Sequence, residues 1–367
     1  MKIRVDLSRS TKDDSYDILI GSGIVQANAG MEITGIFKSI GLKDRACVMT
    51  SETVVRLYGP VLKDFLENAG IKPVVLTLPD GERTKSLNYL SYLYDELIKN
   101  RFERGDFIIA FGGGVIGDLA GYAAATYLRG INFIQIPTTL LADVDSSVGG
   151  KTAIDHPGGK NLIGAFYQPE CVIIDVNFLD TLPERELKNG FAEVIKYGVV
   201  LDAEFFTYLE NNYEKILSYD KDSLMYIIEK SCAIKADVVN KDEKESGLRS
   251  VLNFGHSLGH AIEVLYNYET VKHGEAIAVG MIFASMVSKD LALCTGETVD
   301  RVKTLIKNSG LPASIPDFSP EEYINAMKLD KKVSDKLIKF VLIKDIGGFV
   351  FKELDFEYIS KFLKKIL

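Results

Sequence analysis

The sequence predicts an α/β protein in which an N-terminal parallel-sheet domain, residues 1–180, precedes a mainly α-helical domain, residues 181–367. Three observations predict this fold class. A chain of 367 residues is long enough for two domains of ordinary size. The first half alternates short apolar runs with helical patterns, which is typical of a parallel sheet covered on both faces. After about residue 183, long amphipathic segments replace the strand-like runs.

Short β-branched runs bounded by Pro, Gly or Asp predict the strands of the first domain. These runs are residues 46–50, 74–78, 107–111, 132–136 and 172–176. Residues 1–7 alternate apolar and charged side chains, as a further strand would. From Leu87 to Ile98, apolar residues recur at spacings of three and four, which predicts an amphipathic helix between two of the strands.

Long segments that are charged on one side predict the helices of the second domain. They lie near residues 184–200, 202–217, 222–240, 251–267, 274–294 and 298–309. Two late apolar runs, 339–343 and 349–351, flank a glycine-containing turn and predict a small hairpin. A cleft between an α/β domain and a helical domain is the expected place for a site.

Charge and composition exclude several classes of protein. The 43 Lys+Arg against 51 Asp+Glu give a formal net charge of −8, which argues against nucleic acid or an anionic membrane as partner but not against a small anionic ligand. The longest uncharged apolar stretch, 276–288, is shorter than the roughly 20 residues that cross a bilayer. No signal-like stretch opens the chain, so we expect a cytoplasmic protein. The dispersed cysteines are expected to be small buried hydrophobes: Cys47, Cys171, Cys232 and Cys294.

A glycine-rich turn joins one predicted strand to a predicted helix. Gly112, Gly114 and Gly117 fit the G-x-G-x-x-G spacing, in which backbone amides approach a pyrophosphate at a helix N-terminus. The motif falls in a late strand, so it predicts phosphate binding and a plain structural turn about equally. Residues 80–85 follow another strand end, the edge where α/β sheets place ligands, although a segment of this kind by itself is more often a plain β-turn and helix cap.

Two glycine pairs are each followed by a lysine, Lys151 and Lys160. Residues 149–152 resemble the end of a phosphate-binding P-loop, but Asp145 stands where its first glycine would be. ATP hydrolysis is therefore not expected. Lysines in two similar loops suit an anionic ligand, the alternative being solvated surface lysines.

Three of the four histidines, His256, His260 and His273, fall within 18 residues. His256 and His260 are four apart and share a helix face, so spacing alone selects them as a metal-ligand pair with His273 third. The metalloprotease form of this motif needs Glu directly after the first histidine, where Ser257 stands, so a protease is excluded. The clustering favours metal binding or proton transfer over isolated structural histidines.

Taken together, these motifs resemble the 3-dehydroquinate synthase family of the sugar phosphate cyclase superfamily. The resemblance covers nearly the whole chain and is carried by residues 79–82, 112–118, 135–142, 145–151, 159–166, 190–196 and 253–256. It implies a Rossmann-like nucleotide-binding domain followed by a metal-binding helical domain. It also implies a cytoplasmic, phosphate-eliminating carbon–oxygen lyase of the shikimate pathway, which leads to chorismate and the aromatic amino acids.

The implied reaction converts 3-deoxy-D-arabino-heptulosonate 7-phosphate into 3-dehydroquinate and phosphate. It consists of transient oxidation by NAD, β-elimination of phosphate, re-reduction and an intramolecular aldol closure. The cofactors that the resemblance implies are NAD and a divalent metal ion, zinc or alternatively cobalt. The implied partners are the phosphorylated sugar acid and a second copy of the chain in a homodimer, without nucleic acid or membrane.

The resemblance also implies roles for individual residues. It replaces the spacing-based metal pair by Glu193, His256 and His273, and makes His260 a neighbour that handles a proton or contacts substrate. The NAD positions are Asp80, Gly81, Glu82, Arg83, Thr84, Lys85, Gly114, Val115, Ile116, Gly117, Asp118, Thr138, Thr139, Phe178, Leu179, Asp180 and Thr181. Lys151 and Lys160 would touch the cofactor or the substrate phosphate. The other residues around the substrate are Arg129, Asp145, Asn161, Lys196, Lys235, Glu245, Arg249 and Asn253, with Lys331 or Lys332 as a further lysine.

Three alternatives stay open at this point. A sibling cyclase acting on sedoheptulose 7-phosphate or glucose 6-phosphate shares NAD, metal and fold, although residues 160–164 and Arg249 favour the heptulosonate. A metal-dependent alcohol dehydrogenase of the glycerol-dehydrogenase type would release NADH during turnover. A non-catalytic binding module on this fold would be expected to lose metal ligands or site lysines, which this chain retains.

Overall fold

The computed structural model describes residues 1–7, 14–26, 30–329, 333–334 and 337–367. The chain divides into two compact units, residues 1–182 with 224–244 and residues 183–223 with 245–367. The sequence predicts a single boundary near residue 180, with residues 224–244 in the helical domain. In the structure this segment, most of helix α7 (Lys221–Lys241), packs with the first unit instead. Periodicity shows that a helix has an apolar face but not which domain that face contacts.

The first unit is built on a seven-stranded sheet with the order β1-β2-β9-β6-β5-β3-β4. Strands β1 and β2 pair antiparallel, and the other neighbouring strands are parallel, as the sequence predicts. β2 is a strand that the sequence analysis missed. The strands are β1 (Lys2–Val5), β2 (Tyr16–Gly21), β3 (Arg45–Ser51), β4 (Lys72–Leu78), β5 (Phe107–Gly112), β6 (Asn132–Pro137) and β9 (Cys171–Asp175).

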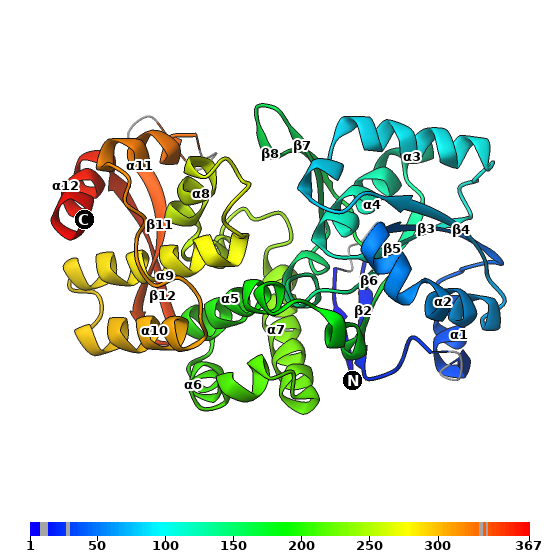
Figure 1. Ribbon diagram of the computed structural model, residues 1–367, viewed down its shortest axis with the longest axis horizontal. Coiled ribbons are helices and arrows are strands. Elements are labelled where there is room, and N and C mark those ends of the chain that lie inside the picture. The colour runs from blue at the N-terminus through cyan, green and yellow to red at the C-terminus, as the bar shows by residue number, and fades with distance from the viewer. Residues whose placement is uncertain (8–13, 27–29, 330–332, 335–336) are drawn as a thin grey trace. The chain divides into compact units, whose positions relative to one another are not determined.

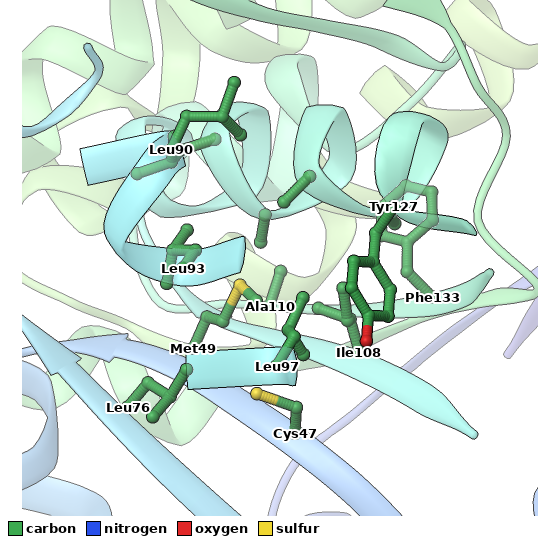
Figure 2. Packing of buried hydrophobic residues seen from close by; sticks show 14 of the residues in the cluster. Cys47, Met49, Leu76, Leu90, Leu93, Leu97, Ile108, Ala110, Tyr127 and Phe133 are labelled. Atoms are coloured by element: carbon green, nitrogen blue, oxygen red, sulfur yellow. The ribbon is translucent and has the colours of Figure 1, made fainter. Parts of the chain in front are cut away.

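Helices cover both faces of this sheet, which explains why its inner strands are apolar throughout (Figure 1). Alternate strand residues such as Cys47, Met49 and Ile108 pack against α3 (Leu87–Lys99) and α4 (Gly114–Thr126), as Figure 2 shows. Their neighbours in the strands pack on the opposite face with α1 (Gly30–Ser39) and α2 (Glu52–Asn68). The predicted two-sided α/β domain is confirmed.

Parallel strands bring their carboxyl ends to one edge of the sheet, where α/β proteins bind ligands. The segments that leave this edge include the 3-10 helices η1 (Glu82–Thr84) and η4 (Val176–Thr181) and a π-helical turn, η3 (Ala142–Ser146). Antiparallel strands β7 (Lys151–His156) and β8 (Gly159–Phe166) form a hairpin after η3. Lys151 and Lys160, expected in loops, are therefore strand residues.

The second unit is mainly helical, as expected, and the predicted late hairpin is present as β11 and β12. The segment expected as one helix over 251–267 is divided, because a 3-10 helix ends at Asn253 before α8 begins at His256. The elements are α5 (Glu184–Leu201), α6 (Ala203–Leu217), η5 (Leu248–Asn253), α8 (His256–Leu265), α9 (His273–Asp290), α10 (Gly296–Asn308), α11 (Pro320–Met327), β10 (Val333–Ser334), β11 (Leu337–Asp345), β12 (Gly348–Asp355) and α12 (Phe356–Ile366).

The four cysteines are free thiols. Cys47, Cys171 and Cys232 are buried, as expected, and Cys294 is half-buried. Burial raises the pKa of Cys47 to about 12, so this thiol stays protonated and unreactive at neutral pH. Within the described residues, no helix has both the length and the apolar character needed to span a bilayer.

Candidate active site

Glu193, His256 and His273 converge inside the second unit from helices α5, α8 and α9. Nε2 of His273 lies 3.2 Å from Oε1 of Glu193, and Nε2 of His256 lies 3.5 Å from the same oxygen. One ligand atom from each residue lies within 4.8 Å of the other two. The structure thus brings together the three residues that the resemblance implies as metal ligands.

The start of α9 is held against α5 at Gly274, next to His273. A Cβ atom at residue 274 would lie 2.1 Å from the carbonyl oxygen of Asn189, so a glycine is required there. The Gly274 N–H donates to Oδ1 of Asn189 over 2.6 Å. Because Asn189 precedes Glu193 by one helical turn, this contact places the His273 imidazole beside the Glu193 carboxylate.

The electrostatics of this cluster fit a bound cation. Burial opposes ionisation of Glu193, but the Lys196 ammonium and the hydrogen bond from the His273 imidazole hold the pKa of its carboxyl well below the usual value. Burial lowers the pKa of His256 to about 4, so this ring is neutral at pH 7. Its Nδ1 lies 3.1 Å from the Phe254 carbonyl oxygen and carries the ring proton. The Nε2 lone pair of His256 therefore faces a carboxylate oxygen, an arrangement that a cation between them stabilises.

His273 supplies a positive charge in the present arrangement. Burial disfavours its charged form, but the Glu263 carboxylate and the hydrogen bond to Glu193 raise the pKa of His273 to about 10. A divalent metal ion can take the place of this proton, because carboxylate oxygen and imidazole nitrogen are its common ligands. The donor set therefore fits a metal ion.

His260 lies beside the cluster, one turn after His256 on α8. Its ring centroid is 5.3 Å from that of His256 and 6.3 Å from that of His273. The group of converging ligand atoms contains Glu193, His256 and His273 and leaves His260 outside it. This geometry agrees with the place that the resemblance implies for His260 and not with the pair chosen from spacing.

The second unit also holds three of the expected substrate residues around η5. Arg249 is almost completely buried, which is unusual for a guanidinium. The Asn253 amide donates to Oε1 of Glu245 over 2.5 Å. The further lysine expected at Lys331 or Lys332 lies outside the described residues.

In the first unit, Lys85 joins three of the segments expected at NAD. Its buried ammonium donates to the carboxylate of Asp118 on α4 and to the side-chain oxygen of Asn161 on β8. Burial disfavours the ammonium, but the surrounding carboxylates of Asp118, Glu82 and Asp155 raise the pKa of Lys85, which therefore stays charged. Lys160 reaches to within 3.8 Å of Glu82 across the same region. The strand end at 80–85, the glycine-rich turn and the hairpin thus meet.

The glycine-rich turn has the form that phosphate binding requires. Helix α4 begins at Gly114 directly after β5, and no side chain in the described part of the chain caps it, so its first backbone N–H groups are available to an anion. A Cβ at Gly117 would lie 2.8 Å from Oε1 of Gln135 on β6, so this glycine allows α4 to pack close to the sheet. The turn therefore fits a dinucleotide.

The remaining positions expected at NAD follow the carboxyl ends of other strands. Asp80 accepts hydrogen bonds from the backbone N–H and hydroxyl of Thr53, over 3.2 and 2.7 Å. The Tyr58 hydroxyl donates to the Phe178 carbonyl oxygen over 3.0 Å and lies 2.6 Å from the Thr181 hydroxyl. The backbone N–H of Thr138, after β6, donates to the carbonyl oxygen of Gly112 over 3.1 Å.

Asp145 and Lys235, both expected at the substrate, are in direct contact within the first unit. The Lys235 ammonium, from α7, donates to the Asp145 backbone carbonyl over 2.7 Å and to the Asp145 carboxylate. The placement of residues 224–244 in this unit is what makes the contact possible.

Arg129 stands apart from the other expected residues of the first unit. It ends η2 (Tyr127–Arg129), three residues before β6 starts, and the register pairs the start of β6 with the start of β5. Arg129 therefore lies at the amino edge of the sheet, opposite the carboxyl edge that carries the glycine-rich turn. Its backbone is left-handed, with φ of 68°, and so are those of Asn161 and Glu245. Such strain is typical of functional positions.

Two buried carboxyl groups near these residues were missed by the sequence analysis. Oε1 of Glu263 lies 3.5 Å from Nδ1 of His273. Asp143, in the π-helical turn, has no hydrogen-bond partner for either carboxylate oxygen among the described residues. The spacing of seven residues between His256 and Glu263 on one helix face was a usable signal, whereas nothing in the sequence marks Asp143.

The fold and site define an enzyme of the sugar phosphate cyclase superfamily. The structure is similar to that of 2-epi-5-epi-valiolone synthase from Streptomyces hygroscopicus with NAD+ and Zn2+ bound, with a TM-score of 0.88, 26% identity and 98% of each chain covered. It shares its fold with a 2-deoxy-scyllo-inosose synthase complexed with carbaglucose-6-phosphate, NAD+ and Co2+, with a TM-score of 0.88, 24% identity and 100% of each chain covered.

Sequence similarity defines the family within this class. Residues 75–189 match the family model of the 3-dehydroquinate synthase N-terminal region, and residues 190–333 match that of the C-terminal region. The chain is 48% identical over 353 residues to the 3-dehydroquinate synthase of Citrifermentans bemidjiense, covering 96% of this chain and 95% of that one. The chain therefore belongs to the 3-dehydroquinate synthase family. Its activity is that of a 3-dehydroquinate synthase, a lyase of the shikimate pathway.

Proposed function

We propose that the chain converts 3-deoxy-D-arabino-heptulosonate 7-phosphate into 3-dehydroquinate and phosphate with bound NAD and a zinc ion held by Glu193, His256 and His273. The observation that carries this proposal is the convergence of both Nε2 atoms on Oε1 of Glu193. A carboxylate with two imidazoles is a catalytic ligand set that leaves coordination positions open to substrate oxygens. The binding of NAD+ and Zn2+ by the valiolone synthase of the same fold supports both cofactors.

When bound, NAD supplies a reversible hydride acceptor, and the metal ion supplies a Lewis acid that acidifies the substrate hydroxyl to be oxidised. The side chains of the second unit bind and orient the substrate around this chemistry. Lys196 and Arg249 are buried cations suited to the carboxylate and phosphate charges of a sugar acid phosphate. His260 relays the hydroxyl proton, because an imidazole can both accept and donate a proton.

The first unit binds the cofactor and part of the substrate. The backbone N–H groups at the start of α4 bind the pyrophosphate, with Lys85 and Asp118 beside them. Lys151 and Lys160 contact the cofactor or the substrate phosphate. Three further side chains orient the substrate, those of Asn161, Asp145 and Lys235. Hydrogen bonds to neighbouring residues of the chain hold these side chains in place. The elimination needs no protein base, since the leaving phosphate can remove the proton itself.

The active form is a homodimer in which Arg129 acts on the substrate of the partner chain. Its position at the amino edge of the sheet, opposite the glycine-rich turn, supports a role outside its own chain's site. A guanidinium binds carboxylate or phosphate with two parallel hydrogen bonds, which suits both anionic groups of the substrate.

Phosphate release from the heptulosonate phosphate, with and without a chelator, tests the proposal. We expect release that stops on chelation and returns with zinc, while NADH absorbance stays flat because hydride is returned in each turnover. Steady NADH accumulation would indicate an alcohol dehydrogenase instead. Release only from sedoheptulose 7-phosphate or glucose 6-phosphate would indicate a sibling cyclase.

His260→Ala should lose turnover and keep its metal. Loss of the metal in this variant would return His260 to the ligand set.

A further inference from the structure

Glu263 lies behind His273, on the side of the ring that faces away from Glu193. Its Oε1 is 3.5 Å from Nδ1 of His273, while Nε2 of the same ring is 3.2 Å from Oε1 of Glu193. The Glu263 and Glu193 side chains are 7% and 0% exposed, so bulk water competes little for either contact. The imidazole is therefore held between two buried carboxylates from α8 and α5.

The two histidines of the cluster are oriented in the same way by different groups. His256 has its Nδ1 against the Phe254 backbone carbonyl and its Nε2 toward Glu193. His273 has its Nδ1 against Glu263 and its Nε2 toward the same Glu193 oxygen. In each ring an acceptor at Nδ1 holds a proton on that nitrogen, so Nε2 is the nitrogen presented to a metal, which in His273 would replace the Nε2 proton.

The position of Glu263 on α8 makes this arrangement possible. His256, His260 and Glu263 are spaced by four and three residues, so they share one face of the helix. One helix thus supplies a ligand, its neighbour and the carboxylate that faces the ligand from α9. A carboxylate behind a ligating imidazole fixes the ring and increases its basicity, and removing such a group typically costs about 10–100-fold in metal affinity.

We propose that Glu263 is a positioning residue that accepts the Nδ1–H of His273, holds Nε2 toward Glu193 and thereby sets the affinity of the site for a divalent metal. This inference rests on the proposed function, since it assumes a metal at Glu193, His256 and His273. The group behind His256 is a backbone carbonyl, which no substitution removes. The group behind His273 is the Glu263 side chain, so substitution of Glu263 can test how the orientation of a ligating imidazole affects metal binding.

The test measures Zn2+ affinity by competition with a chromophoric chelator, and the Co2+ absorption spectrum, in the full-length protein. Glu263→Gln keeps an acceptor oxygen but loses the charge, and should bind Zn2+ about 10-fold more weakly. Glu263→Leu also loses the acceptor, and should bind about 100-fold more weakly with an altered Co2+ spectrum. If Glu263→Leu fails to fold, the isosteric Glu263→Gln decides the result.

Glu275→Gln is the matched control, because Glu275 is on α9 two residues after His273 but pairs with Arg185 over 2.6 and 2.8 Å. It should leave Zn2+ affinity unchanged. Equal losses in Glu275→Gln and Glu263→Gln would show a general loosening of α9 and overturn the proposal. Parent-like affinity in both Glu263 variants, with loss in His273→Ala, would also overturn it while leaving the metal site intact. Parent-like affinity in His273→Ala would overturn the metal site itself.

Discussion

The ammonium of Lys196 and the carboxylate of Glu193 form an ion pair one turn apart on α5, with side chains that are 2% and 0% exposed. Removing one partner of a buried pair costs about 3–5 kcal/mol where the other charge is left without a counterion, and less where a second cation stays beside it, as the His273 imidazolium does here. A divalent cation at the Glu193, His256 and His273 cluster can supply the missing positive charge. The pair therefore links the stability of the second unit to metal binding.

Lys196→Met should lower the free energy of unfolding of the metal-free protein, but by less than the roughly 3 kcal/mol expected for an unpaired buried charge, because Glu193 loses the ammonium and keeps the His273 imidazolium. Zn2+ should stabilise this variant more than it stabilises the parent. Phosphate release should be lost while NAD binding, measured by calorimetry, is retained. Chemical unfolding with and without Zn2+ checks the stability changes.

Lys361→Met is the control for this change, because Lys361 pairs with Glu357 at the exposed surface of α12. Exposed pairs of this kind contribute little to stability, so this change should leave the unfolding transition almost where it is in the parent. If metal-free Lys196→Met unfolds at the same denaturant concentration as the parent, the ion pair does not stabilise the second unit and the link to metal binding is wrong.

Local sequence patterns predict where the helices and strands of this fold lie better than they predict which other elements each one packs against. Strands β3, β5 and β6 are buried on both faces. Each therefore has a continuous apolar sequence, and a few residues are enough to predict a buried strand. The alternation in β2 is short and was missed, and the hairpin of β7 and β8 was mistaken for two loops around glycines. Helix α7 was predicted but assigned to the other domain, since packing partners depend on the whole chain.

The Glu193, His256 and His273 cluster shows the same difference between what neighbouring residues reveal and what depends on the tertiary fold. Spacing finds residues on one helix, so it selected His256 and His260 on α8. The converging set instead takes one residue from each of three helices, and the distance from Glu193 to His273 depends on the close approach of α5 and α9 at Gly274. Only the resemblance to a family pointed to that set from the sequence.

Arg129 provides a test of the proposed dimer through complementation. Arg129→Ala and Lys196→Met homodimers should each be inactive. In a mixed dimer, the site of the Arg129→Ala chain keeps its own Lys196 and receives Arg129 from the partner, so one of the two sites should work. Phosphate release by separately tagged, co-refolded chains measures this recovery.

Mixing Lys196→Met with His256→Ala is the control and should recover nothing, because both residues belong to the same unit of one chain. Absence of recovery in the first mixture would place Arg129 in its own chain's site.

Asp143 combines complete burial with two carboxylate oxygens that have no hydrogen-bond partner among the described residues. Burial, with the nearby Asp175 carboxylate, raises the pKa of Asp143 well above its ordinary value of 3.8. The native protein therefore keeps this proton at pH values where the unfolded chain has released it. Stability is lost as pH rises from the unfolded pKa toward the native one, at about 1.4 kcal/mol per pH unit.

Asp143→Asn should remove this loss, because the amide has a similar shape and does not ionise. The free energy of unfolding of the variant, compared with that of the parent, should rise as pH increases above the unfolded pKa, at up to about 1.4 kcal/mol per pH unit, and level off once pH exceeds the native pKa, as measured by urea unfolding followed by circular dichroism. Asp175→Asn is the contrasting control, since the Asp175 carboxylate accepts the backbone N–H groups of Gly23 and Val25 over 2.8 and 2.9 Å. Its loss should destabilise the protein by about 1–3 kcal/mol. A constant difference between Asp143→Asn and the parent across this pH range would mean that Asp143 is ionised in the native protein.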